Sequence, residues 1–105
     1  MKIKFSSLKR NYTLKYEFDN ETITCTYKDN EQTVTDNFNF SNFTENDELA
    51  EVNTDIPVKV IQSAERVNGE MKVELFKTYN INKEERIEKY GYGNLPFSTD
   101  WQEVE

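Results

Sequence analysis

The sequence predicts a mainly β domain, an antiparallel meander followed by a β-hairpin, packed as a small sandwich-like sheet with one short helix near the C-terminus. Three observations support this: apolar and polar residues alternate from residue 12, short polar pairs separate the alternating runs, and Asn-Gly occupies positions 68 and 69. Alternation with a period of two is typical of a half-buried strand. An α+β arrangement is the alternative. The length of 105 residues fits one domain, so we expect a single domain over residues 1–105.

The first predicted strand covers residues 2–8, with Ile3 and Phe5 facing inward. The meander follows over residues 12–40. One face of its first strand carries only large apolar side chains, which are Tyr12, Leu14, Tyr16 and Phe18. The polar side chains between them predict an opposite face in contact with solvent.

Two Asp-Asn pairs set the predicted register of the meander. We predict two-residue turns at 19–20 and 29–30, because Asp and Asn tolerate the positive φ of type I′ turns. These turns place Leu14 opposite Cys25 and Cys25 opposite Val34, which keeps the large apolar side chains on one face. Asp36 does not fit this face, so we expect it near the sheet margin, where its carboxylate reaches water.

Asn68-Gly69 is the strongest hairpin signal in the chain. It predicts a hairpin over residues 56–77, with Ala64 opposite Val73 and Gln62 opposite Leu75. The inner face of this hairpin is then shared by Val60, Ala64, Met71, Val73 and Leu75. Glu65 and Lys72 form an exposed pair on the other face, which contributes little stability.

Three further segments do not read as strands. Residues 41–55 are rich in Asn and acids and predict a long connecting loop, with one helical turn near 47–52. Residues 82–90 predict a two-turn helix, because Asn82 is followed by Glu85 as in a capping box and Gly91 ends the segment. Residues 91–105 predict an irregular aromatic tail.

Composition excludes several function classes. The chain has no His and one Cys, Cys25, so it has no internal disulfide, no Cys-based zinc cage and no imidazole catalyst. We therefore predict no enzyme activity, no catalytic or metal-ligating residues and no cofactor. The net charge of −7 disfavours direct contact with nucleic acid or an anionic membrane. The sequence has no apolar run long enough for a signal peptide or a membrane span.

The negative charge is concentrated in one part of the chain. Residues 29–57 contain eight acids and no base. Carboxylates and amides can bind hard cations, but this stretch lacks the Asp-rich order and the glycine of a calcium loop, so a solvated loop is the favoured interpretation. Mimicry of DNA phosphates is the alternative. The candidate acidic residues are Glu45, Asp47, Glu48, Glu51 and Asp55.

The aromatic tail is the other candidate surface. Tyr92, Phe97 and Trp101 are residue types that stack on sugars or anchor protein interfaces. The favoured interpretation is that these rings fold back over the open side of a small sheet. Cys25 lies in a predicted strand with no base beside it, so we expect a buried thiol rather than a nucleophile.

The order of segments resembles a family of small uncharacterised proteins encoded by bacteriophages and prophages of Gram-positive bacteria, often near tail and baseplate genes. The similar segments are Met1-Lys2-Ile3-Lys4-Phe5, Val34 to Ser41, Glu48-Leu49, Ile56-Pro57, Ile61 to Glu70, Val73-Glu74-Leu75 and Trp101-Gln102-Glu103-Val104. The chain departs from the family in the polar stretch 77–90. The resemblance implies a viral origin and a tail-associated role, and it supplies no site residues.

From these observations we expect a non-enzymatic phage protein that acts through contacts with a phage or host protein, as a minor tail or baseplate component or as an assembly factor. Open sheet edges also favour a homo-oligomer. The expected location is the host cytoplasm or the virion. A small acidic inhibitor of a host nucleic-acid-binding protein is the alternative function, and a carbohydrate-binding module is the third.

Overall fold

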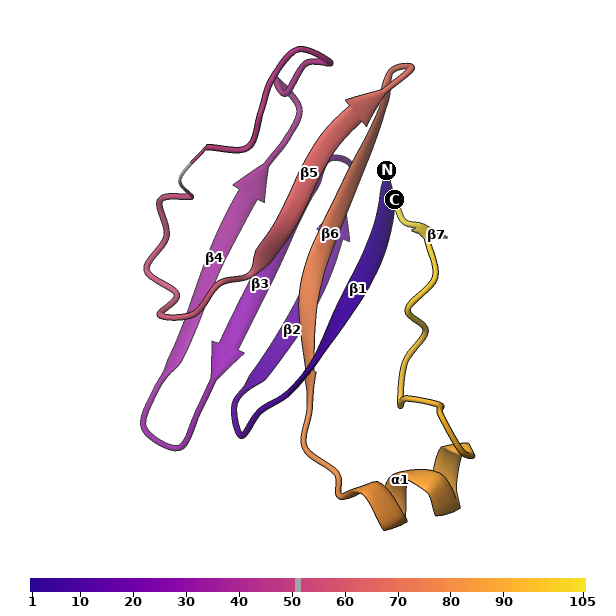
Figure 1. The fold of residues 1–105 in the computed structure, drawn as a ribbon. Coiled ribbons are helices and arrows are strands. Elements are labelled where there is room, and N and C mark those ends of the chain that lie inside the picture. The colour runs from indigo at the N-terminus through magenta and orange to yellow at the C-terminus, as the bar shows by residue number, and fades with distance from the viewer. Residues whose placement is uncertain (51) are drawn as a thin grey trace.

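Two β-sheets lie face to face in the computed structural model, which describes residues 1–50 and 52–105 (Figure 1). The strand orders are β2-β3-β4 and β5-β6-β1-β7. The elements are β1 (Lys2–Lys9), β2 (Thr13–Asp19), β3 (Thr22–Lys28), β4 (Thr33–Asn39), β5 (Ile61–Val67), β6 (Glu70–Tyr79), α1 (Lys83–Tyr90) and β7 (Gln102–Glu103). The predicted mainly β, sandwich-like fold with a short helix near the C-terminus is confirmed.

The pairing of β1 makes the larger sheet mixed. β1 runs parallel to β6, with Ile3 opposite Val73 and Phe5 opposite Leu75. Parallel neighbours need a crossover connection. Here the connection from β1 to β6 contains the three strands of the other sheet and then β5 (Figure 1). The crossover therefore includes the whole meander.

The meander is confirmed, but its predicted register is wrong by two residues. Leu14 pairs with Tyr27 and Tyr16 pairs with Cys25, while Cys25 pairs with Asp36 on its other side. Because side chains alternate with a period of two, this shift leaves the same residues on the inner face. The apolar pattern therefore determined the faces and not the register.

The local cause of the shift is the geometry of the two turns. Asp19, which was predicted to lie in the turn, instead pairs with Thr22, so the first turn consists of residues 20–21, and Asn20 has a φ of 56°. The second turn has four residues rather than two. The Asp29 carboxylate accepts hydrogen bonds from the main-chain N–H of Glu31 (2.8 Å) and Gln32 (2.9 Å), which stabilises the longer turn.

The hairpin turn at Asn68-Gly69 is confirmed. Both residues have positive φ, 50° and 81°, as a type I′ turn requires. Ala64 faces Val73 as predicted. The predictions for the far end are wrong: Ile61, not Gln62, pairs with Leu75, because the register shifts between Ile61 and Ser63.

The first strand of the hairpin also begins later than expected, at Ile61 rather than near residue 56. Pro57 has no N–H to donate to a ladder, so the preceding residues continue the connection instead. We define residues 41–60 as the connecting segment. Its predicted helical turn near 47–52 does not form in residues 47–50 and 52, which have no regular secondary structure, and residue 51 lies outside the described residues.

The core lies between the two sheets. Tyr16 and Phe5 come from opposite sheets and stack with ring centroids 5.8 Å apart, and the Tyr16 hydroxyl donates to the Phe76 carbonyl. No polar side chain is buried among the described residues. The buried apolar residues are Ile3, Phe5, Leu14, Ile23, Cys25, Tyr27, Phe38, Phe40, Ile56, Val60, Ile61, Met71, Val73 and Leu75.

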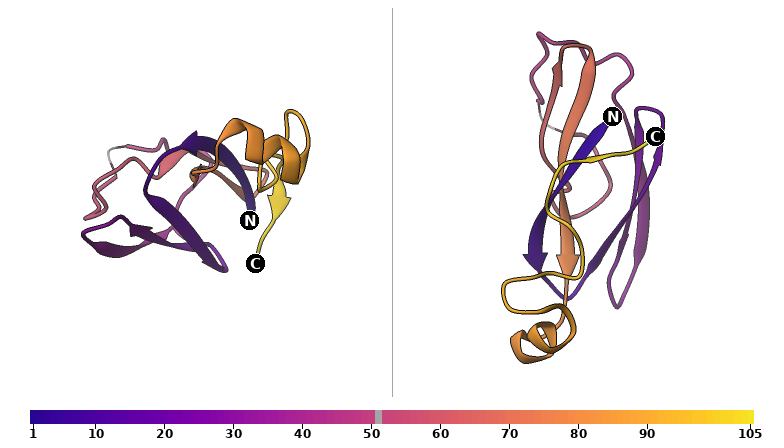
Figure 2. Two further views of the ribbon diagram at one scale, coloured as in Figure 1. Left: turned by 90° about the horizontal axis from the view of Figure 1, so that it is seen from below. Right: turned by 90° about the vertical axis from the view of Figure 1, so that its right-hand side faces the viewer.

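The C-terminal part lies along the β1 side of the sandwich, as two further views show (Figure 2). The predicted helix forms over Lys83–Tyr90, and the Asn82 side chain caps it by accepting from the Glu85 N–H at 2.8 Å. Residues 91–101 are irregular, and the tail ends beside β1, where β7 pairs with Lys2 and Ile3.

Candidate interaction groove

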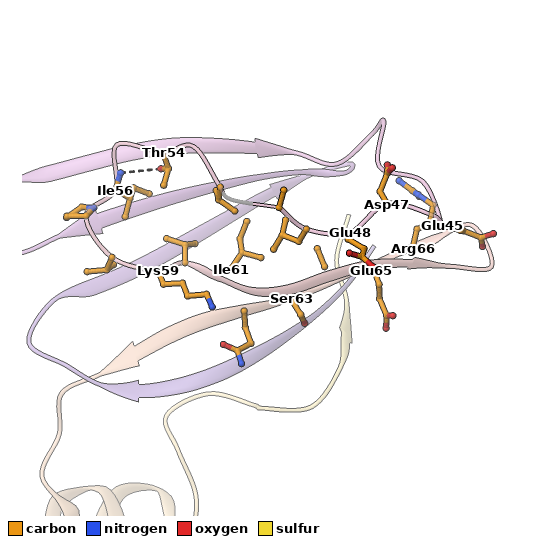
Figure 3. A pocket seen from close by; sticks show the side chains of 18 residues that line it. Glu45, Asp47, Glu48, Thr54, Ile56, Lys59, Ile61, Ser63, Glu65 and Arg66 are labelled. Atoms are coloured by element: carbon orange, nitrogen blue, oxygen red, sulfur yellow. Dashed lines mark hydrogen bonds between the residues drawn. The ribbon is translucent and has the colours of Figure 1, made fainter.

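A groove runs between the connecting segment and β5. Its volume is about 870 Å³, which is within the range of ligand pockets, roughly 300–1,000 Å³. Figure 3 shows Ile61 pointing toward the connecting segment, whereas Ser63 and Glu65 lie at the outer rim of this space and point away from that segment. The walls mix the apolar Leu49, Val52, Val58 and Ile61 with carboxylates. We call this space the groove.

Arg66 fixes one end of the groove. Its guanidinium donates to both carboxylate oxygens of Glu21, at 2.8 and 3.0 Å, and this two-point pairing favours arginine over lysine. It also donates to the main-chain carbonyls of Phe40 (2.9 Å), Phe43 and Gly69 (2.9 Å). Arg66 therefore ties β5 to the other sheet and to the start of the connecting segment.

The Glu21–Arg66 pair is partly shielded from solvent, with side-chain exposures of 30% and 13%. The hydrogen bond from Arg66 holds the pKa of Glu21 below its ordinary value. The same bond raises the pKa of Arg66. Both groups are therefore charged across the physiological range, and the contact persists there.

A second contact closes the same end of the groove. The Glu45 carboxylate accepts from the Gly69 N–H at 3.0 Å. Asp47 accepts from the Thr44 N–H at 2.7 Å, and its own N–H donates to the Thr44 carbonyl. This part of the connecting segment is therefore held to the tip of the β5–β6 hairpin by charged hydrogen bonds.

Asp36 fixes the other end. It lies on β4, an edge strand, and is half-buried. Its carboxylate accepts from the Thr54 hydroxyl at 2.6 Å and from the Asp55 N–H at 3.4 Å. The Thr54 hydrogen bond, followed by the one from the Asn37 N–H, holds the pKa of Asp36 below its ordinary value. Asp36 thus anchors the connecting segment instead of only facing water.

The predicted acidic residues lie in different places. Glu45, Asp47 and Glu48 are exposed and line the groove. Asp55 is exposed but is not part of the lining, and Glu51 lies outside the described residues. The lining also includes Glu65 of β5, which the sequence analysis did not place among the acidic candidates and which pairs with Lys72 as predicted.

The predicted aromatic surface does not form one platform. Phe97 is half-buried and packs edge-on against Phe5 (6.1 Å) and Tyr79 (6.5 Å). Trp101 has the Lys72 ammonium 5.0 Å from its ring centroid, and Tyr92 is 82% exposed. No aromatic pair joins any two of the three predicted rings among the described residues.

Sequence reasoning missed Arg66 as the centre of the site, although the signal was present. Arg66 is two residues after Ala64 in the same strand and pairs with Met71. The alternation of side chains therefore placed the Arg66 guanidinium on the inner face, with Ala64. A charge on a face that is being buried needs partners. Those partners come from residues 21, 40 and 43, which no local pattern connects to position 66.

Two features bear on chemistry. Cys25 is fully buried, and its burial raises the pKa of its thiol to about 11, so a thiolate nucleophile is disfavoured at neutral pH. Among residues 1–50 and 52–105, no three His, Cys, Asp or Glu side chains lie close enough together to hold a metal ion.

Comparison of the chain with protein-family models, with curated proteins and with solved structures found no match. In the described part of the chain, no helix has the length and apolar character needed to cross a membrane.

Proposed function

We propose that this protein is a non-enzymatic binding module that contacts a protein partner through the groove. One observation carries the proposal: the connecting segment is tied down at both ends, by Arg66 and by Asp36, while the space between the ties stays open. Clefts of this volume are common binding sites in proteins.

The composition of the groove walls supports a protein as the partner. Apolar side chains of the lining supply area that a partner can bury, and its exposed carboxylates can select the partner and its orientation. The resemblance to phage-encoded proteins extends the proposal to a tail or baseplate component or an assembly factor, in the host cytoplasm or in the virion.

Site-specific photo-crosslinking tests this function. A photoreactive amino acid at Ser63, which is exposed in the groove, should form one discrete adduct with a partner protein in the cells that express this protein. The matched control is the same amino acid at Lys15, exposed on β2. Equal adducts from both positions, or none from Ser63, would contradict the proposal.

A second candidate is the small acidic inhibitor that mimics DNA. The exposed carboxylates of Glu45, Asp47, Glu48 and Glu65 along one groove favour it, since spaced anions can occupy a basic nucleic-acid site. Such binding should weaken steeply as ionic strength rises, because exposed charge pairs are screened. A complex that keeps its affinity in high salt would exclude this candidate.

A further inference from the structure

We infer that the groove binds an extended, basic peptide segment of the partner, which adds as a strand to the free edge of β5. This inference rests on the proposed function and specifies the occupant of the same site. Three independent features support it: the unpaired main chain of β5, the dimensions of the groove, and the charge of its rim.

The first feature is the sheet edge. β5 is the terminal strand of its sheet and pairs only with β6. Val67 and Glu70 flank the two-residue turn and form a hydrogen-bonded pair, so alternation directs the N–H and C=O of Arg66 and Ala64 away from β6. Among the described residues, no hydrogen bond outside the strand ladders ends on the main chain of either residue.

These free groups lie along the groove. Ala64 and Arg66 both belong to its lining, as do Gln62, Ser63 and Glu65 between and beside them. An unpaired edge of this kind is a template for strand addition, in which main-chain hydrogen bonds supply affinity and alternate side chains supply specificity. Native proteins often cover such edges, but here the connecting segment stands off and leaves a cavity.

The dimensions fit an extended segment. β5 has seven residues, so at about 3.4 Å per residue its edge is about 24 Å long and accommodates up to about seven residues of an added strand. Alternate side chains of that strand would face the apolar wall that includes Leu49 and Val52, and the others would face solvent. An occupant with alternating apolar residues meets this requirement.

The charge of the rim selects a basic occupant. Four acids line the groove, against Lys59 and an Arg66 that is already paired with Glu21. Lysine or arginine at the solvent-facing positions of the added strand would complement this rim. A second copy of this chain is disfavoured, because pairing two β5 edges would bring like charges together across the new interface.

The test uses a fluorescent peptide that alternates lysine with valine, Lys-Val-Lys-Val-Lys-Val-Lys, and the intact chain. We expect saturable binding in an anisotropy titration and slower hydrogen exchange at the amides of Ala64 and Arg66 in NMR spectra. The same peptide with glutamate in place of lysine should not bind. Absence of binding by the lysine peptide at about 1 mM, or protection at other amides instead, would overturn the inference.

N-methylated peptides separate strand addition from other modes of contact without altering the protein. Methyl groups on alternate amides remove donors from one edge of the peptide only. We expect one of the two methylated sets to bind at least about tenfold more weakly than the other, because only one edge faces β5. Equal affinities of the two sets would overturn strand addition.

The charge requirement is tested with a double variant, Glu48→Lys and Glu65→Lys, whose side chains make no hydrogen bond in the described structure. It should bind the lysine peptide at least about tenfold more weakly. The control, Glu84→Lys and Glu88→Lys on α1, changes net charge equally but lies outside the groove, and it should retain the affinity. Equal losses in both variants would contradict a role for the rim.

The two proposals can fail separately. If the peptide protects groove amides but both methylated sets bind equally, the groove is a binding site and strand addition is wrong. If photo-crosslinking at Ser63 captures no protein, the proposed function fails whatever the peptide does.

Discussion

The connecting segment and the C-terminal tail both cover an open side of the sandwich, but different forces hold them in place. The connecting segment is rich in acids, is fixed at its ends by hydrogen bonds to Arg66 and Asp36, and buries Ile56 and Val60 in the core. The tail is held by ring packing of Phe97 and by the two-residue strand β7 beside β1. The cavity beside the connecting segment has a volume of about 870 Å³, whereas the hollow lined by Phe97 and neighbouring residues of the tail is smaller, about 490 Å³.

Among the substitutions considered, Arg66→Ala should lower the stability of the protein most. It removes donors from Glu21 and three carbonyls at once, so we expect the free energy of unfolding to fall by about 3 kcal/mol, at the low end for a broken buried pair because this one is partly exposed. Urea unfolding measures the change. Arg10→Ala is the control, because Arg10 is exposed and donates only to the neighbouring Lys9 carbonyl.

Arg66→Lys sharpens the same test. Lysine keeps the charge but cannot donate to two carboxylate oxygens and the surrounding carbonyls together. Stability close to that of the Ala variant would show that geometry matters more than charge. Full rescue by Lys would mean that the connecting segment depends on charge alone.

Phe97→Ala tests the ring packing of the tail. Phe97 is half-buried against Phe5 and Tyr79, with the Lys77 ammonium 5.2 Å from its ring centroid. We expect a loss of about 2 kcal/mol, less than for a fully buried ring. Thermal or urea unfolding followed by circular dichroism measures it. If Phe97→Ala lowered the free energy of unfolding as much as Arg66→Ala, the tail and the connecting segment would not differ in how strongly they are held.

Trp101→Ala should have a smaller effect. The ring is 41% exposed, and the Lys72 ammonium lies over it in a cation–π contact. We expect a loss of about 1 kcal/mol or less. A cooperative loss of structure on this change would mean that Trp101 belongs to the core. Quenching of Trp101 fluorescence by added sugars would instead support the carbohydrate-binding alternative.

Acid should loosen the connecting segment before the tail, and this local effect is the smallest that we predict. The pKa of Asp36 is depressed by its hydrogen bonds from Thr54 and Asn37, and the pKa of Glu21 is depressed by Arg66. A depressed pKa in the folded state contributes stability above the unfolded value, about 4, and that contribution disappears as the pH falls through the folded value.

Amide hydrogen exchange between about pH 5 and pH 2 measures the acid effect. We expect the amides of Asp55 and Ile56 to lose protection earlier than that of Val104, whose N–H bonds to the Met1 carbonyl. Asp36→Asn removes the titrating group and should abolish the pH dependence at residues 55 and 56. Simultaneous loss of protection in both regions would contradict separate anchoring.

Parts of the molecule also differ in how far the sequence predicts them. Asn82 and Gly91 marked the helix ends correctly, because a cap is formed by residues within one turn of each other. The predicted register of the meander was wrong, because apolar alternation cannot distinguish a shift of two residues. The aromatic residues of the tail were correctly noticed, but their separate environments depend on contacts with β1 and β6.

The sequence by itself determined strands β1 to β6 in outline, their buried faces, the hairpin turn at Asn68-Gly69 and the acidic character of the connecting segment, because each depends on neighbours a few residues away. It did not predict β7, which lies in the segment expected to be an irregular tail. Tertiary structure alone decided the parallel pairing of β1 with β6, the contacts of Arg66 and the cavity beside β5. These features join residues 20 to 70 positions apart. Local preferences do not specify such contacts, which form only when segments distant in the sequence come together.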